Sequence, residues 1–280
     1  MNLKNNRTLL AVHAHPDDES IGTGGILAKY VAQGIKTVVI FCTRGEEGDI
    51  QDPSFVPPSP GMEIKEIRKI ELDRALKVLQ VGASFFLGYR DSGMAGTPAN
   101  RHPQAFAQAN LEEAAKKLVR IIRQTSPQVM VTYNEKGTYG HPDHIMANRV
   151  TRRAFEAAGD PGFIDGSGFP PWRPAKLYYM AISRTRLRMM VQLAKERGEK
   201  LEFDPEVLGT PEERISTRID VREFLAQKFE AISCHESQFG PQSFFRRIPE
   251  EWREEAFGQE HFECVIGCSS GNETDLFEGL

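Results

Sequence analysis

The segment AVHAHPDDESIGTGG, residues 11–25, gathers side chains that bind metals or transfer protons. His15, Asp17 and Asp18 follow an apolar run and precede a cluster of glycines. A loop that cradles phosphate would offer glycines and a helix N-terminus without adjacent carboxylates, because carboxylates repel an anion. The segment therefore indicates a cation site or acid–base chemistry rather than a phosphate site.

A second segment, GTYGHPDHIMAN at residues 137–148, repeats this local pattern. In each segment a His-Pro-Asp triplet is followed by another ligand-type residue, which singles out His15 with Asp18 and His141 with His144. A spacing of three at the start of a helix lets the two side chains of a pair converge. If both segments meet at one edge of a sheet, they can bind one cation, and the mixture of imidazole and carboxylate favours zinc.

The elements that must position these two segments alternate between strands and helices. Apolar runs typical of strands and amphipathic runs typical of helices follow one another along the chain. The expected strands are residues 8–14, 36–43, 83–88, 128–133, 175–183 and 214–221, and the expected helices are 20–34, 62–80, 110–127, 144–159, 184–200 and 222–233. This order favours an α/β fold of the Rossmann-like three-layer type, with a mostly parallel sheet and an elaborated C-terminal part.

Two parts of the chain differ in pattern. We expect residues 1–160 to form a Rossmann-like catalytic core that carries both metal segments. Residues 161–280 are expected to be a C-terminal extension of the same domain that covers the substrate crevice, because the alternation loosens after Pro161 and then resumes. Long loops at 43–61 and 88–106 follow expected strands, and in open parallel sheets such loops build the ligand crevice.

Composition and charge narrow the class of partner. The 280 residues are 40% hydrophobic, which suits a large globular domain. With 35 Lys and Arg against 39 Asp and Glu the net charge is -4, so the chain lacks the excess of basic residues that is typical of a nucleic-acid-binding protein.

No segment approaches the roughly 18 apolar residues of a membrane span, and the N-terminus becomes polar before it could form the apolar core of a signal peptide. We expect a cytoplasmic protein with a small-molecule partner, no nucleic acid and no membrane insertion, and a homo-oligomer stays open.

The remaining histidines and the cysteines are weaker signals. His13 lies inside the first expected strand, so core packing is its expected role. His102, His235 and His261 each stand alone; of these, His235 in the segment SCHESQ is the one that could line the crevice. The four cysteines are too few and too scattered for a disulfide framework or a zinc site, and we expect buried or surface thiols at Cys42, Cys234, Cys264 and Cys268.

Two of these motifs carry a family resemblance. AHPDDE near the N-terminus and GHPDH near the middle resemble the LmbE-like (PIG-L) family of metal-dependent N-deacetylases. VHAHPDDES, GYRDSGM and TYNEKGTYGHPDH are similar to its mycothiol-pathway branch, which comprises GlcNAc-inositol deacetylases and mycothiol-conjugate amidases. The likeness covers residues 1–155 well and the segment TRIDVREFLAQKFEAISCHESQ more weakly.

The resemblance implies a zinc-dependent hydrolase that removes the acetyl group from the nitrogen of an N-acetylglucosaminide, such as N-acetylglucosaminyl-inositol. It implies one metal ion per chain, zinc or alternatively ferrous iron, bound by His15, Asp18 and His144. Asp17 would act as the general base, and His141 would be the electrophilic partner of the amide oxygen.

Further roles extend this assignment. Asp143 would tune the electrophilic histidine, and Tyr139 lies close enough in sequence to assist it. The substrate contacts implied are Arg68, Asp91 and Ser92, although a solvated helix residue and turn residues would equally explain them.

The same assignment makes chemical sense without the family. Three protein ligands leave an open position for water, whereas a fourth would close a structural site. An amide needs both an activated water and a stabilised oxyanion, and a positioned base is worth roughly 100 to 10,000-fold.

Three alternatives stay open. One is an amidase that acts on thiol-conjugate or other N-acyl amides. Another is a non-haem iron oxygenase, which also uses two histidines and a carboxylate but on an all-β scaffold. The third is a non-catalytic metal-binding protein, which could dispense with Asp17 and His141, both present here.

Overall fold

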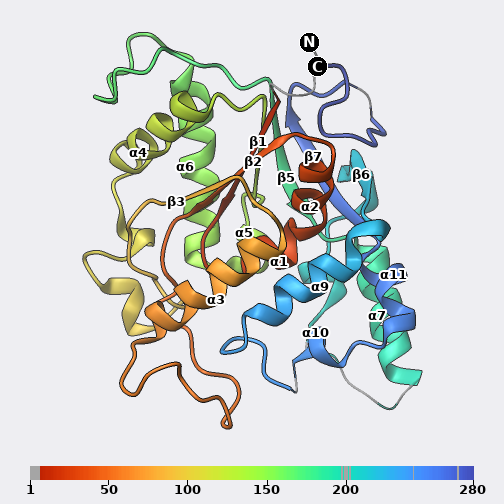
Figure 1. Ribbon diagram of the computed structural model, residues 1–280. Coiled ribbons are helices and arrows are strands. Elements are labelled where there is room, and N and C mark those ends of the chain that lie inside the picture. Colours follow the sequence, from red (N-terminus) through yellow and green to blue (C-terminus); the bar gives the residue numbers. More distant parts are fainter. Residues whose placement is uncertain (1–6, 197, 199–200, 202, 242, 270) are drawn as a thin grey trace.

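One seven-stranded sheet runs through the protein, in the strand order β3-β2-β1-β4-β5-β7-β6 (Figure 1). The computed structural model describes residues 7–196, 198, 201, 203–241, 243–269 and 271–280. The start of the expected core at residue 1 and the end of the expected helix at residue 200 lie outside the described residues.

The strands and helices follow the predicted alternation. The strands are β1 (Thr8–His13), β2 (Lys36–Phe41), β3 (Ala83–Phe86), β4 (Val129–Thr132), β5 (Lys176–Ala181), β6 (Thr217–Asp220) and β7 (Gln259–Ile266). The helices are α1 (Asp18–Gly22), α2 (Gly24–Ala32), α3 (Ile64–Val78), α4 (Leu111–Thr125), α5 (Gly137–Gly140), α6 (Pro142–Ala158), α7 (Arg184–Glu196), α8 (Pro205–Leu208), α9 (Leu225–Cys234), α10 (Phe244–Arg247) and α11 (Glu250–Phe257).

Strands β1 to β5 run parallel to one another, and β7 runs antiparallel to both β5 and β6. This confirms the predicted α/β fold with a mostly parallel sheet. Strand β7 has no alternating apolar pattern from which it could be predicted, because polar residues occupy buried positions along it. Glu260 and His261 are both buried, and only partners from distant segments make that burial tolerable.

The helices form a layer on each face of the sheet. Helices α2, α3 and α9 pack together on one face, and α4 and α6 pack together on the other (Figure 1). The strand order turns back between β1 and β4, which pair directly with Leu10 opposite Met130. The segments that follow these two strands therefore lie at the same edge of the sheet. In a sheet of this type the ligand crevice forms outside the carboxyl ends of the strands at that switch point.

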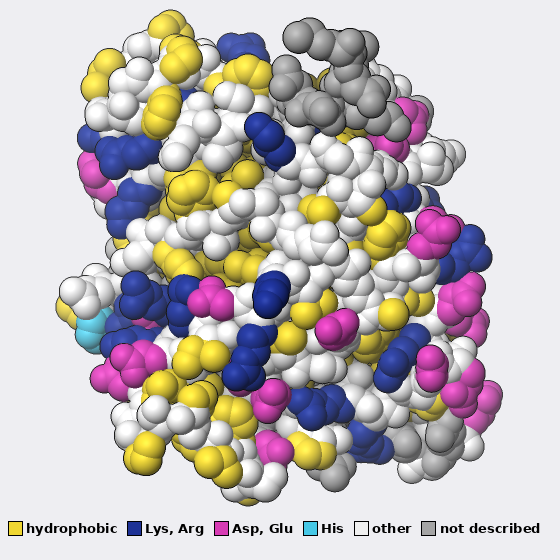
Figure 2. Space-filling view, viewed as in Figure 1, with side chains coloured by type: hydrophobic (Ala, Val, Ile, Leu, Met, Phe, Trp, Pro, Cys, Tyr) yellow, Lys and Arg dark blue, Asp and Glu magenta, His cyan; other side chains and the backbone are white. Residues whose placement is uncertain are grey.

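On the face seen in Figure 2, Lys and Arg side chains are interspersed with Asp and Glu. Such mixing agrees with the small net charge of -4. Within the part of the chain that the structure describes, none of the helices has the length and apolar character needed to cross a membrane.

The expectation that all four cysteines are thiols is wrong for two of them. Cys264 and Cys268 form a disulfide, with their Cα atoms 5.6 Å apart. The chain turns at Gly267, whose φ of 77° lies in the left-handed region, and this turn brings the two residues together. The sequence spacing alone does not reveal the turn. Cys42 is buried and Cys234 half-buried, and both are free thiols.

The N-terminus of α2 packs tightly against the C-terminal part of the chain. A Cβ atom on Gly25 would lie 2.7 Å from Cβ of Val221 and 2.9 Å from Oε1 of Glu260. The Glu260 carboxylate accepts hydrogen bonds from the backbone N–H groups of Gly25 and Ile26 and from Lys228 Nζ. Gly25 therefore allows close packing of α2 against this part of the chain. The negative charge of the Glu260 carboxylate also interacts favourably with the positive end of the α2 helix dipole.

We predict that Gly25→Ala lowers the free energy of unfolding by about 1 to 3 kcal/mol, because the added methyl group overpacks the contact with Val221 and Glu260. Gly271→Ala is the matched control, since a Cβ there would meet nothing within 4 Å. Urea denaturation of both variants measures the effect. A Gly25→Ala protein as stable as the control would contradict the packing argument.

Candidate metal centre

The loop after β1 folds three carboxylates around a sharp turn. Asp17 precedes α1 with φ 117° and ψ -31°, a backbone conformation that residues other than glycine rarely adopt. Holding such a residue costs about 1 to 3 kcal/mol, which the surrounding contacts must offset. Because of the turn, Asp18 points back along the chain, and its Oδ2 accepts a hydrogen bond of 2.8 Å from the N–H of His15.

The loop after β4 presents two histidines at the start of α6. His141 is the N-cap residue, and its Nδ1 accepts a hydrogen bond of 3.2 Å from the N–H of Asp143. His144 stacks on Tyr133, with ring centroids 4.0 Å apart. The Tyr133 hydroxyl accepts the N–H of Ala14 at 2.8 Å, so the ends of β4 and β1 are tied together directly.

In the structure the Asp18 carboxylate lies between His15 and His144. His15 Nδ1 lies 3.3 Å from Asp18 Oδ2, and His144 Nε2 lies 3.4 Å from Asp18 Oδ1. Two ligand atoms bound tetrahedrally at about 2.0 to 2.2 Å from zinc would be roughly 3.4 Å apart, which matches both distances.

The surroundings of His144 test whether a cation fits. Both of its ring nitrogens are buried, and neither has a hydrogen-bond partner among the described residues. An unpaired buried imidazole is costly, and a bound cation would satisfy Nε2. The residues present therefore fit a metal ion. Two triads that share His15 have all their donor atoms within 4.8 Å of one another, and neither includes Asp18: His15, His141 and His144, and His15, Asp91 and Asp143.

Carboxylates surround the other nitrogen of His15. Its Nε2 lies 3.2 Å from Asp143 Oδ2 and 3.5 Å from Asp91 Oδ1. Ser92 donates to the Asp143 carboxylate through its N–H and its hydroxyl. Burial alone would raise the pKa of Asp91, but His15 and the N–H of Gly93 hold it below its usual range. These contacts orient the imidazole so that Nδ1 faces Asp18.

The Arg68 guanidinium forms hydrogen bonds with the loop that carries Asp17. The guanidinium is buried and donates to the Pro16 carbonyl at 2.6 Å, the Gly45 carbonyl at 3.0 Å and Asp17 Oδ2 at 3.0 Å. Burial raises the pKa of Asp17 to about 6, although Arg68 opposes that shift. Arg68 was expected to contact substrate, and the structure places it beneath Asp17.

Around the centre Tyr139 is exposed, whereas His141 is buried. The His141 ring is 4.6 Å from that of His15, and burial followed by the charge of His15 lowers the pKa of His141 to about 4. Tyr139 is 53% exposed, with its ring 5.0 Å from the His144 ring. A ligand that enters the centre would thus meet Tyr139 first.

Sequence reasoning missed the support beneath this centre. Glu19 is fully buried and accepts the N–H of Asp17, and His235 Nε2 lies 2.9 Å from the Glu19 carboxylate. The expectation that His235 could line the crevice is wrong, because its side chain is fully buried under the loop. The sequence feature that could have indicated this support is Glu19, the last residue of the HPDDE motif. His13 packs in the core as expected, with Nε2 2.9 Å from Thr23 Oγ1.

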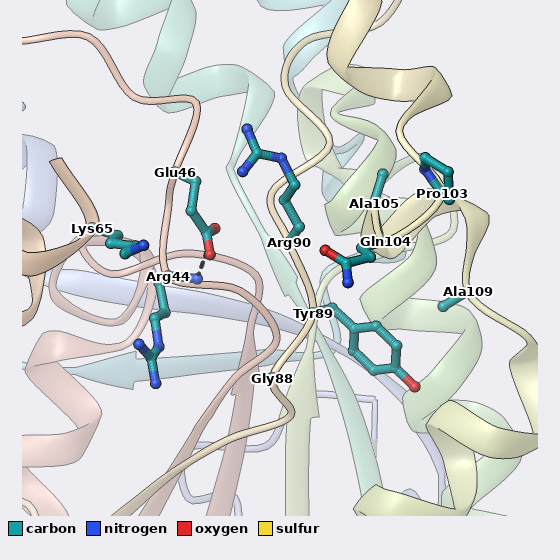
Figure 3. A pocket seen from close by; sticks show the side chains of 10 residues that line it. All are labelled: Arg44, Glu46, Lys65, Gly88, Tyr89, Arg90, Pro103, Gln104, Ala105 and Ala109. Atoms are coloured by element: carbon teal, nitrogen blue, oxygen red, sulfur yellow. Dashed lines mark hydrogen bonds between the residues drawn. The ribbon is translucent and has the colours of Figure 1, made fainter. Parts of the chain in front are cut away.

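A pocket of about 500 Å³ lies beside the centre, where β2 and β3 end. Figure 3 shows Arg44, Glu46 and Lys65 on one side of it and Tyr89, Gln104 and Ala105 on the other, with Arg90 between them. The pocket adjoins the metal centre through the backbone, because Glu46 accepts the N–H of Asp91 at 3.0 Å. Its lining is rich in hydrogen-bonding groups and suits a polar ligand.

The chain is similar to proteins of a known family. The PIG-L family model, described as GlcNAc-PI de-N-acetylase, matches residues 10–155. The chain is 40% identical to 1D-myo-inositol 2-acetamido-2-deoxy-alpha-D-glucopyranoside deacetylase 1 of Catenulispora acidiphila, over 98% of this chain and 90% of that protein.

Two solved structures share the fold. The N,N'-diacetylchitobiose deacetylase of Pyrococcus horikoshii superimposes with a TM-score of 0.64 at 21% identity, covering 93% of this chain and 84% of that one. GalB, the 4-carboxy-2-hydroxymuconate hydratase of Pseudomonas putida KT2440, has a TM-score of 0.62 at 18% identity, covering 94% of this chain and 98% of that one. The family match and the relative of 40% identity, which extends over nearly the full length, show that the chain belongs to the PIG-L family.

Proposed function

We propose that this protein is a metal-dependent hydrolase that removes the acetyl group from the nitrogen of an N-acetylglucosaminide, such as N-acetylglucosaminyl-inositol. The observation that carries the proposal is the meeting of two His-Pro-Asp segments around His144, whose buried ring nitrogens make no hydrogen bond among the described residues and whose Nε2 lies 3.4 Å from Asp18 Oδ1. The 40%-identical relative, named as a deacetylase of such a glycoside, supports the same activity.

We assign the metal to His15, Asp18 and His144, one ion per chain, with zinc as the first choice and ferrous iron as the alternative. His141 is a poorer ligand because its Nδ1 already accepts the Asp143 N–H. The ring proton is then on Nε2, so neither nitrogen has a free lone pair for the metal. Asp143 is also less available, since its two oxygens are used by Ser92 and His15. When bound, the ion would lower the pKa of a coordinated water and polarise the amide carbonyl.

Asp17 is assigned as the general base. It is adjacent to the ligand Asp18, but its carboxylate turns to Arg68 at 3.0 Å instead of joining the ligand set. A carboxylate held in this way can accept a proton from water and return it to the leaving amine. The ion pair with Arg68 restricts its rotamers, which favours a single orientation for proton transfer.

His141 is assigned as the donor to the developing oxyanion. Because its Nδ1 accepts the Asp143 N–H, the ring proton sits on Nε2, and a neutral imidazole can donate from there. Asp143 tunes this histidine by fixing its tautomer. Loss of one such donor in other enzymes costs about 2.7 to 4 kcal/mol. Tyr139 adds a second donor at the opening, and burial raises its pKa, so the hydroxyl stays protonated.

Substrate contacts are proposed at Asp91, Ser92 and Arg68. Asp91 lies between the metal centre and the pocket of Figure 3, where a carboxylate can accept hydrogen bonds from sugar hydroxyls. Ser92 and Arg68 are both buried, so they would act mainly by shaping the floor of the site.

The organisation of the chain also enters the proposal. Residues 1–160 supply both metal segments, and 161–280 continue the same sheet through β5, β7 and β6. We propose that they are a catalytic core and its extension over the crevice. We further propose that the enzyme acts in the cytoplasm on a small-molecule amino-sugar amide.

An amidase for bulkier N-acyl or thiol-conjugate amides is the second candidate, and one cavity favours it. This cavity of about 350 Å³ is lined mainly by apolar side chains, and Ile21, which borders it, follows Asp18 by one helical turn. It could hold an apolar substituent. Parallel assays of acetate release from a glucosaminide and of cleavage of a conjugate amide would distinguish the two activities.

We predict that His144→Ala removes metal and activity together, because two remaining ligands are too few to retain the ion. Metal content by elemental analysis and amine release from an N-acetylglucosaminide measure both effects. His102→Ala, at a histidine outside the centre, is the control and should keep both. Full metal occupancy in His144→Ala would overturn the ligand assignment.

Asp17 and Asp18 should respond differently to the same substitution. Asp18→Asn replaces an anionic ligand with a weaker neutral one, so metal affinity should fall and excess zinc should restore part of the activity. Asp17→Asn should keep its metal but lose about 100-fold or more in kcat, because an amide cannot take the proton from water. Metal content and kcat across a zinc titration test both. A rescuable Asp17→Asn beside a metal-replete, inactive Asp18→Asn would reverse the two roles.

The pocket in Figure 3 predicts a preference for glycosides over the free sugar. Groups beyond the reacting ring can lower the barrier when they bind, so kcat/KM should be about tenfold or more higher for an inositol or aryl N-acetylglucosaminide than for N-acetylglucosamine. The methyl glycoside serves as the control for a blocked anomeric centre. Equal kcat/KM for all of these compounds would contradict this prediction.

A further inference from the structure

The backbone of Asp17 is held in an unfavourable conformation by a side chain two residues away. Asp17 has a φ of 117°, and its N–H donates to Glu19 Oε2 at 2.9 Å. In a capping box the carboxylate that accepts the N–H of the N-cap residue belongs to the third helical position, but here it belongs to the second. The contact therefore serves this particular turn rather than ordinary helix capping.

Glu19 is itself held by partners that are fully buried. Its Oε1 accepts the Ser20 hydroxyl at 2.6 Å and lies 2.9 Å from His235 Nε2, and all three residues have 0% exposure. A carboxylate removed from water is costly unless it is paired and hydrogen-bonded. His235 comes from the end of α9, so the C-terminal part of the chain fixes a carboxylate beneath the loop after β1.

Arg68 holds the same turn from the opposite side. Its Nη2 donates to the Pro16 carbonyl at 2.6 Å and to Asp17 Oδ2 at 3.0 Å. The peptide of Asp17 is thus bound by Glu19 and its carboxylate by Arg68. With both ends fixed, the direction of the Asp17 side chain is determined by contacts from α1, α3 and α9.

We propose that Glu19, supported by His235, is a positioning residue: it holds the Asp17 backbone in the conformation that aims the Asp17 carboxylate for proton transfer. This inference rests on the proposed role of Asp17 as general base. Glu19 does not touch the metal ligands' donor atoms through any hydrogen bond among the described residues, so its action passes through Asp17. It also accounts for a histidine far along the chain that the chemistry itself does not use.

Glu19→Gln is the first test. The amide keeps the size of the side chain but cannot accept hydrogen bonds at both ends, so the Asp17 turn loosens. A misplacement of about 1 Å can cost on the order of 100-fold in rate, and we expect kcat to fall by roughly 10 to 100-fold. KM and metal content should stay near those of the unaltered protein, because neither the substrate contacts nor the ligands change.

Glu71→Gln is the matched control for general loss of stability. Glu71 is also buried and accepts the N–H and hydroxyl of Ser237 at 2.6 and 2.7 Å, close to His235 in sequence, but it does not contact Asp17. A comparable fall in Tm with kcat retained is expected. If Glu71→Gln lowers kcat as much as Glu19→Gln does, the effect is structural and the inference fails.

A double-mutant cycle with Asp17→Asn gives the decisive measurement. If Glu19 acts through Asp17, adding Glu19→Gln to Asp17→Asn should lower the residual kcat by less than about twofold, because residues that act as a unit are non-additive. A second full loss of 10 to 100-fold would overturn the inference. Should Glu19→Gln fail to fold, His235→Gln, whose hydrogen-bond path to Asp17 runs through Glu19, takes its place in the same cycle.

The cycle also separates this inference from the proposed function. Full activity in Asp17→Asn alone would reject Asp17 as the base, and with it the proton-transfer role. A strongly impaired Asp17→Asn beside a fully active Glu19→Gln would leave the proposed function intact and reject only the positioning role.

Discussion

Several ionisable side chains are buried together where β1 and β4 end, and their need for partners links the segments that surround the site. A lone buried charge is costly, so each group needs a partner at hydrogen-bonding distance. Those partners come from distant segments: Arg68 on α3 reaches Asp17, and His235 at the end of α9 reaches Glu19. The site therefore forms only when both helices have packed on the sheet.

Asp17 and Asp18 are adjacent carboxylates, but their surroundings shift their pKa values in opposite directions. Burial raises the pKa of Asp17 to about 6 against the opposing charge of Arg68. Burial would also raise the pKa of Asp18, but His144 and His15 hold it well below its usual range. Adjacent residues of nearly identical chemistry thus become a candidate base and a candidate ligand, because a turn with positive φ sends their side chains in different directions.

The scaffold itself is less specific than the site. A hydratase with a TM-score of 0.62 shares this fold at 18% identity, so the sheet and its helices do not by themselves define a reaction. The chemistry depends instead on the groups placed at the switch point between β1 and β4. Their arrangement is compatible with hydrolysis, since the candidate ligands, base and oxyanion donor are separate residues within one buried cluster.

The amino-acid sequence by itself determined the alternation of strands and helices, the mostly parallel sheet and the two His-Pro-Asp segments, because hydrophobic periodicity and ligand spacing are local properties. It did not reveal β7, the disulfide between Cys264 and Cys268, or the pairing of Glu19 with His235. Each of these joins residues through a turn or across the fold. Only the tertiary structure decided which polar groups are buried together, because desolvation and charge pairing depend on distances in space rather than on separation along the chain.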